Sequence, residues 1–141
     1  MRLSRKYYQQ IVAHARRGKP NEICGLVAGK DGLPVKLYET TNSDARPRVR
    51  YNVDPMELLT ALREIEEKGW ELIAIYHSHP MSEAYPSGTD VSLAYYPDAV
   101  YIIVSLADDA PVVRAFKITD GLITEQDMLI ETGGEPAGEA A

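Results

Sequence analysis

Residues 71–90 read ELIAIYHSHPMSEAYPSGTD and hold two of the three histidines of the chain. The apolar run at 72–76 is short, partly β-branched and preceded by a Gly-Trp break, so it predicts a buried strand rather than a helix. His77 and His79 follow at the C-terminal end of this strand. Because residues two apart in a strand point to the same face, both imidazoles can reach one point in space.

Ser87 and Asp90 predict the start of a helix shortly after the strand. Pro80 ends the strand, a polar loop follows, and Ser87 then serves as the N-cap with Asp90 in the first turn. A loop of this length can fold back and bring the carboxylate towards the imidazoles. Two imidazole nitrogens and one carboxylate oxygen leave a zinc ion one open position for water. A simpler interpretation stays open, with surface histidines at a strand end and a metal-free capping box.

The spacing of these residues resembles that of the JAMM (MPN-plus) metalloproteases, whose motif is a distant Glu, His-x-His, seven residues, Ser, two residues and Asp. His77, His79, Ser87 and Asp90 match every spacing, and Glu22 is the upstream partner. The resemblance implies one zinc ion per chain held by the two histidines and Asp90. It also implies that Glu22 is the general base and acid, and that the Ser87 hydroxyl stabilises a tetrahedral oxyanion in competition with its capping role.

The same resemblance implies a reaction, the hydrolysis of an amide bond. Substrates of that family are peptide or isopeptide bonds after the C-terminal Gly-Gly of ubiquitin or ubiquitin-like proteins, including small sulfur carriers. We therefore expect a ubiquitin-like or sulfur-carrier protein as the substrate partner.

Two alternatives to this function stay open. One is a non-catalytic MPN-type binding or scaffold module, against which the complete ligand set argues. The other is a mononuclear iron enzyme, because two histidines and one carboxylate also form the facial triad.

Length and composition predict a single soluble domain. The chain has 141 residues, enough to bury a core without disulfides, and 45% of them are hydrophobic. We expect the JAMM-like domain to span residues 1–131. Residues 132–141 are dominated by Gly, Pro, Glu and Ala, which predicts a disordered tail.

Charge and terminal composition argue against several partners. The net charge of −6 disfavours nucleic acid, which needs a positive patch. No apolar run approaches a membrane span, and the N-terminus lacks the apolar segment of a secretory signal, so we expect a cytoplasmic protein with no membrane partner.

The single cysteine, Cys24, fits a reducing compartment, and its apolar strand context favours packing over catalysis. Arg46, Arg48 and Arg50 form either a local site for an acidic group or a solvated loop.

The order of the expected elements indicates the fold class. Two amphipathic helices precede the central strand, and His14 lies on the first as a structural or surface residue. The order implies an α+β domain with a mixed, largely antiparallel β-sheet flanked by helices, and the resemblance implies the JAMM/MPN, cytidine-deaminase-like type. The expected elements are a helix at 4–18, a hairpin at 22–41, an irregular stretch at 42–53, a helix at 54–69, a strand at 72–76, a short helix at 87–96, and strands at 99–106, 112–119 and 122–130.

Overall fold

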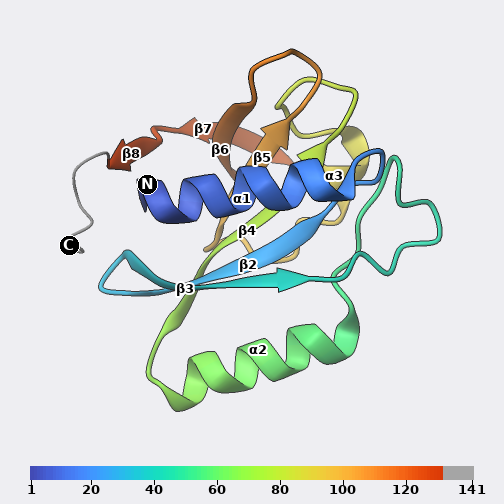
Figure 1. The fold of residues 1–141 in the computed structure, drawn as a ribbon. Coiled ribbons are helices and arrows are strands. Elements are labelled where there is room, and N and C mark those ends of the chain that lie inside the picture. Colours follow the sequence, from blue (N-terminus) through green and yellow to red (C-terminus); the bar gives the residue numbers. More distant parts are fainter. Residues whose placement is uncertain (132–141) are drawn as a thin grey trace.

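The computed structural model describes residues 1–131, which form a six-stranded mixed sheet with one long helix on each face and a separate two-stranded sheet (Figure 1). The expected tail, residues 132–141, lies outside the described residues. The elements, in chain order, are β1 (Arg2–Ser4), α1 (Arg5–Gly18), β2 (Cys24–Lys30), β3 (Leu33–Thr40), α2 (Pro55–Glu67), β4 (Glu71–His79), α3 (Gly88–Ser92), β5 (Val100–Ser105), β6 (Val112–Thr119), β7 (Leu122–Gln126) and β8 (Leu129–Glu131).

Strand β4 lies inside a six-stranded sheet of order β3-β2-β4-β5-β6-β7. It pairs in antiparallel fashion with β2, where Cys24 lies opposite His77, and in parallel with β5. The other neighbouring strands of this sheet pair in antiparallel fashion. The expected fold class, a mixed and largely antiparallel sheet flanked by helices, is therefore confirmed.

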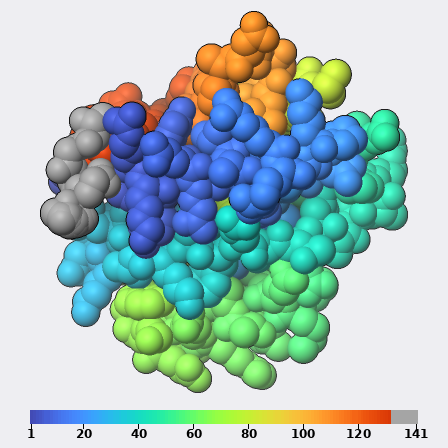
Figure 2. All heavy atoms as spheres, viewed as in Figure 1, coloured from blue at the N-terminus to red at the C-terminus, as the bar shows by residue number. Residues whose placement is uncertain are grey.

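Alternation along β4 separates two hydrophobic cores. Ala74 and Tyr76 belong to the core under α1, which includes Ile11, Val12 and Ala15 of that helix. Ile75 of β4 and Ala61 of α2 belong to the core on the opposite face. On the face seen in Figure 2, the β2–β3 hairpin lies between the blue helix α1 and the green helix α2.

The two long helices begin at the residues that their capping signals predict. Ser4 is the N-cap of α1, and its side chain accepts a hydrogen bond from the backbone N–H of Tyr7 at 3.3 Å. Asp54 is the N-cap of α2 and accepts from the N–H of Glu57 at 3.1 Å, with proline in the first turn. A side-chain oxygen at this position satisfies an N–H that lacks a partner within the helix.

Two expected elements differ from the structure. The single last strand expected at 122–130 is wrong: the chain leaves the sheet after β7, and β8 pairs in parallel with β1 in a separate two-stranded sheet. This pairing joins opposite ends of the domain, so local sequence does not reveal it. The short helix ends at Ser92 rather than near Tyr96: the N–H groups of Ala94 and Tyr95 donate to the carbonyls of Val91 and Leu93, and that of Tyr96 donates to the hydroxyl of Tyr101 at 3.2 Å.

Within residues 1–131, no helix combines the length and the apolar character that crossing a bilayer requires.

Gly25 of β2 leaves the space that the ring of Tyr76 fills on the neighbouring strand. A Cβ atom at position 25 would lie 2.2 Å from two ring carbons of Tyr76, a fully buried side chain with no room to move. Gly25→Ala is therefore expected to lower the free energy of unfolding by about 1–3 kcal/mol, the usual cost of overpacking. Urea unfolding measures this change. The matched control is Gly88→Ala, whose Cβ would meet nothing within 4 Å; equal losses in the two variants would contradict this packing.

Candidate metal centre and active site

Three side-chain atoms meet at the C-terminal end of β4. His77 Nε2 lies 3.2 Å from His79 Nε2 and 3.2 Å from Asp90 Oδ2, and His79 Nε2 lies 3.0 Å from Asp90 Oδ2. All three residues are buried. The structure thus brings together the two histidines and the carboxylate that the sequence predicts as neighbours, and these three groups could hold a metal ion.

The local fold explains how each side chain reaches this point. The two histidines are two residues apart on β4 and therefore share a face. Asp90 lies in the first turn of α3, where a capping box fixes it: its Oδ2 accepts the N–H of Ser87 at 2.9 Å, and its own N–H donates to Ser87 Oγ at 3.0 Å. The carboxylate is therefore oriented before any ligand binds.

The hydrogen bond of His79 determines which of its nitrogens carries the proton. Nδ1 lies 2.7 Å from the backbone carbonyl oxygen of Glu83, which can only accept, so Nδ1 is the donor. In the neutral ring, Nε2 then carries a lone pair that faces the Asp90 oxygen at 3.0 Å. Two facing lone pairs repel each other, so this contact requires either a proton on Nε2 or a cation between the atoms.

The spacing of the three atoms fits a tetrahedral cation. Bonds of about 2.0–2.1 Å to a tetrahedral zinc ion place neighbouring ligand atoms about 3.3 Å apart. The observed separations of 3.0 to 3.2 Å are close to that value. A histidine ligand commonly donates its other ring N–H to a carbonyl, as His79 does to Glu83.

The charge states of the three groups also suit a metal. Burial lowers the pKa of His77 and keeps its imidazole neutral, although Asp90 acts in the opposite direction. Burial alone would raise the pKa of Asp90, but hydrogen bonds from both histidines outweigh it and hold the pKa of that carboxyl well below its usual range. Burial opposes protonation of His79, while Asp90 and the Glu83 carbonyl raise its pKa overall. Metal and proton therefore compete for His79.

Glu22 lies just before β2, close to the same site. It is only 5% exposed. Burial raises its pKa to about 8, opposed by His79 and assisted by Asp90 and Asp44. Ile23 exchanges hydrogen bonds with Ser78 and Cys24 lies opposite His77, so Glu22 lies at the end of β4 that carries His79. Its Oε1 atom makes no hydrogen bond to any of residues 1–131. A buried carboxyl with a raised pKa and an unpaired oxygen is typical of a group that exchanges protons.

Ser87 keeps a proton available despite its capping role. Its Oγ accepts the N–H of Asp90, and a hydroxyl that accepts one hydrogen bond can still donate its own proton. The residue is exposed at the start of α3. The capping bond therefore uses a lone pair of this hydroxyl rather than its proton.

Two residues that support the site, Ser78 and Ser105, could not be identified from the sequence pattern. Ser78 lies between the histidines and accepts the N–H of Ile23 at 2.9 Å, which ties β4 to the segment that holds Glu22. Ser105 at the end of β5 donates to the carbonyl of Ser82 at 2.6 Å and so anchors the loop between β4 and α3. Alternation along the strand predicts that Ser78 faces away from the metal, but nothing local predicts its partner.

The loop at 42–53 contacts the centre through Tyr51. Tyr51 stacks on the His77 ring with centroids 4.3 Å apart and an angle of 21° between the planes. Arg46 and Arg48 are exposed, whereas Arg50 lies 3.3 Å from Asp44 through its Nε. The three arginines predicted as a cluster therefore differ in environment.

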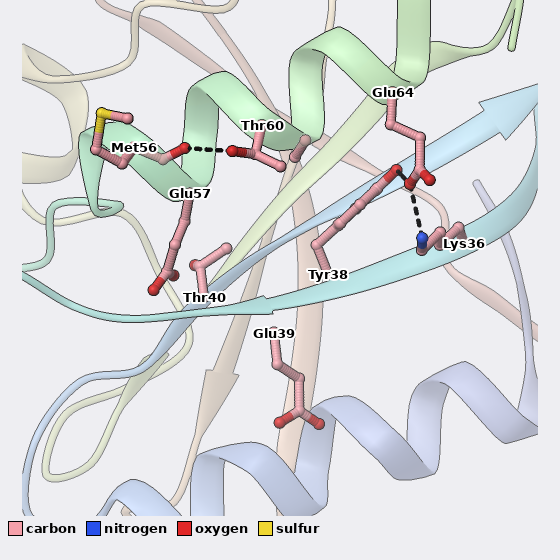
Figure 3. A pocket seen from close by; sticks show the side chains of 9 residues that line it. Lys36, Tyr38, Glu39, Thr40, Met56, Glu57, Thr60 and Glu64 are labelled. Atoms are coloured by element: carbon pink, nitrogen blue, oxygen red, sulfur yellow. Dashed lines mark hydrogen bonds and ion pairs between the residues drawn. The ribbon is translucent and has the colours of Figure 1, made fainter. Parts of the chain in front are cut away.

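Among the cavities lined by residues 1–131, two concern the site and the neighbouring face of the sheet. One of about 420 Å³ adjoins the metal centre through Tyr51 and is lined by three further tyrosines, Tyr95, Tyr96 and Tyr101. The other, of about 590 Å³, lies between β3 and α2 (Figure 3). In that second cavity Glu64 accepts hydrogen bonds from Lys36, at 2.6 Å, and from the hydroxyl of Tyr38. Its lining includes neither Glu22 nor the three metal candidates.

Comparison with known proteins decides the family. The sequence model of the prokaryotic homologs of the JAB domain matches residues 4–119. This chain belongs to that family. A CysO-cysteine peptidase of Mycobacterium tuberculosis is 43% identical to this Prok-JAB chain over 121 residues, covering 84% of this chain and 82% of the relative. A desampylase of Haloferax volcanii is 42% identical over 101 residues, covering 67% and 73%.

A solved structure of related sequence shares this fold. A protein from Desulfitobacterium hafniense has a TM-score of 0.82 against this Prok-JAB chain, with 36% identity and 92% of each chain covered. The expected JAMM-type family is therefore confirmed, and so is the expected class of activity, that of a peptidase.

The raised pKa of Glu22 predicts a pH dependence of stability. Between its ordinary value of 4.5 and about 8, the folded protein holds a proton that the unfolded chain releases. Folding stability of the metal-free protein should therefore fall as pH rises through this window, and Glu22→Gln should escape that loss. Urea unfolding of the two metal-free proteins at several pH values measures the difference. If the difference in the free energy of unfolding between wild type and variant stayed constant across this pH window, the pKa of Glu22 would not be raised.

Proposed function

We propose that this chain is a zinc-dependent peptidase or isopeptidase that hydrolyses an amide bond after the C-terminal Gly-Gly of a ubiquitin-like or sulfur-carrier protein. The observation that carries the proposal is the buried triangle of His77, His79 and Asp90 with the unpaired carboxyl of Glu22 beside it. The names of the relatives, a CysO-cysteine peptidase and a desampylase, support this class of substrate.

His77, His79 and Asp90 would hold the zinc ion as three protein ligands, which leaves a position open for water. When bound, zinc supplies a water with a pKa of about 7 and polarises the substrate carbonyl. The protein contributes orientation: the Glu83 carbonyl holds the ring of His79, and the capping box holds the carboxylate of Asp90. These groups need little rearrangement to bind the ion.

Glu22 is the proposed general base and acid. Burial favours its protonated form, and a divalent cation nearby would favour the carboxylate, so the two effects bring its pKa towards neutrality. A carboxylate in that range can take the proton of the attacking water and then pass it to the leaving amine. The unpaired Oε1 provides the atom for both transfers.

Ser87 is the proposed oxyanion donor. Its hydroxyl lies at the exposed start of α3, next to the Asp90 ligand, and retains its proton. An oriented donor of this kind stabilises the negative charge that develops on the carbonyl oxygen as the tetrahedral intermediate forms. The capping bond from Asp90 fixes the oxygen of Ser87, so the donor is positioned before substrate binds.

The complete site disfavours a scaffold role. Leaving a carboxyl buried with an unpaired oxygen costs stability, and a binding module gains nothing from it. The iron alternative uses the same three ligands, so it is separated by metal identity rather than by geometry.

A panel of ubiquitin-like and sulfur-carrier precursors with residues appended after Gly-Gly tests the proposal. We expect cleavage directly after the second glycine, loss of cleavage with a chelator, and recovery when zinc is added back, because the water must be activated by the metal. Mass spectrometry of the products locates the cleaved bond. Cleavage that continues in chelator-treated, metal-free protein would overturn the zinc mechanism.

Two substitutions separate the base from the ligands. Glu22→Gln removes the proton acceptor but no ligand, so zinc content should stay near that of the wild type while kcat falls by about two to four orders of magnitude. His77→Ala should lose both zinc and activity. Elemental analysis and single-substrate kinetics measure the two effects.

Glu83→Gln is the matched control for this pair. Only the backbone carbonyl of Glu83 contacts His79, and its side chain is exposed, so its carboxyl is dispensable in this account. Activity lost in Glu83→Gln and retained in Glu22→Gln would transfer the base role to Glu83.

A further inference from the structure

The side chain of Asn42, just after β3, uses its full hydrogen-bonding capacity. Its Nδ2 group donates to the backbone carbonyl of Glu22 at 2.9 Å and to that of Arg50 at 3.0 Å. Its Oδ1 atom accepts the backbone N–H groups of Asp44 and Asn52, both at 3.0 Å. A primary amide has two donor hydrogens and two acceptor lone pairs, so all four are occupied.

Backbone contacts position Glu22, because its side chain offers no equivalent contact. The Glu22 N–H donates to the carbonyl of Pro47 at 2.7 Å, and its carbonyl accepts from Asn42. The Oε1 atom, by contrast, is buried without a hydrogen-bond partner in the described chain. The location of the carboxyl therefore depends on the loop at 42–53, which holds both backbone groups of this residue.

The same amide also fixes the segment around Tyr51. Asn42 holds the carbonyl of Arg50 and the N–H of Asn52, the residues on either side of the tyrosine. Tyr51 in turn stacks on the ring of His77. One side chain thus connects the carboxyl beside the metal centre with the ring that packs against one of its ligands.

We infer that Asn42 is a positioning residue of the active site, which sets the distance of the Glu22 carboxyl from the reacting water and keeps Tyr51 against His77. The inference rests on the proposed function, because it assigns the effect of Asn42 to the general base. Asn42 makes no hydrogen bond to the metal ligands, which lie on β4 and α3, and it reaches one of them, His77, only through Tyr51.

Three variants test the inference on the zinc-loaded protein with a Gly-Gly precursor. Asn42→Ala removes all four hydrogen bonds. Asn42→Asp keeps both acceptor contacts to Asp44 and Asn52, but it replaces the donor to Glu22 and Arg50 by a carboxylate oxygen that repels those two carbonyls. Asn52→Ala is the matched control, because it removes an exposed amide whose Nδ2 bonds only to Ser43 Oγ within the same loop.

Misplacing a catalytic group by about 1 Å can cost about a hundredfold in rate, so both Asn42 variants should lower kcat by about ten- to a hundredfold. Zinc content should stay at one ion per chain in all three variants, and Asn52→Ala should keep kcat near that of the wild type. Losses of equal size in Asn42→Asp and Asn52→Ala would assign the effect to general loosening of the loop and overturn the inference.

A double-mutant cycle with Glu22→Gln separates an effect of Asn42 on the general base from a purely structural effect. If Asn42 acts through Glu22, adding Asn42→Asp to Glu22→Gln should change kcat by less than about threefold, because coupled residues are not additive. Full additivity would overturn the inference. An undiminished rate in Glu22→Gln alone would instead refute the proposed function, so the two failures are distinguishable.

Discussion

Three electronegative atoms held within 3.2 Å of one another in a buried site impose the constraint on which this structure depends. The Glu83 carbonyl commits the proton of His79 to Nδ1, so its Nε2 lone pair faces the Asp90 carboxylate. Such an arrangement is unfavourable without a positive charge at its centre. A proton relieves one contact of the triangle, whereas a single metal ion satisfies all three ligands at once.

Each of the three residues lies on a rigid element of the fold. Strand β4 is paired on both sides, so the two histidines have little freedom. A capping box holds Asp90, and Ser105 anchors the loop that joins the strand to α3. The carboxyl of Glu22 is positioned differently, through backbone contacts to a loop. A rigid ligand set and a separately held base match the two tasks that we propose for the site, which are to bind the ion and to transfer protons.

Local patterns predict those parts of the site that depend on local geometry. Strand alternation brings the side chains of His77 and His79 to one face, and the N-cap pattern places Asp90, so these are accessible to sequence reasoning. Glu22 follows from the resemblance of its segment to a known family. The contacts of Asn42 and the pairing of β1 with β8 join residues distant in the sequence, and no local pattern specifies such partners. The contact of Tyr96 with Tyr101, just beyond α3, likewise involves a side chain from another element.

X-ray absorption and anomalous diffraction of the purified protein test the central claim most directly. We expect one zinc ion per chain, with an anomalous peak within about 2.0–2.2 Å of His77 Nε2, His79 Nε2 and an Asp90 oxygen. The His77→Ala protein should show no such peak. A stoichiometric iron signal at these three ligands would contradict the zinc assignment, and zinc bound elsewhere with this triangle empty would contradict the account as a whole.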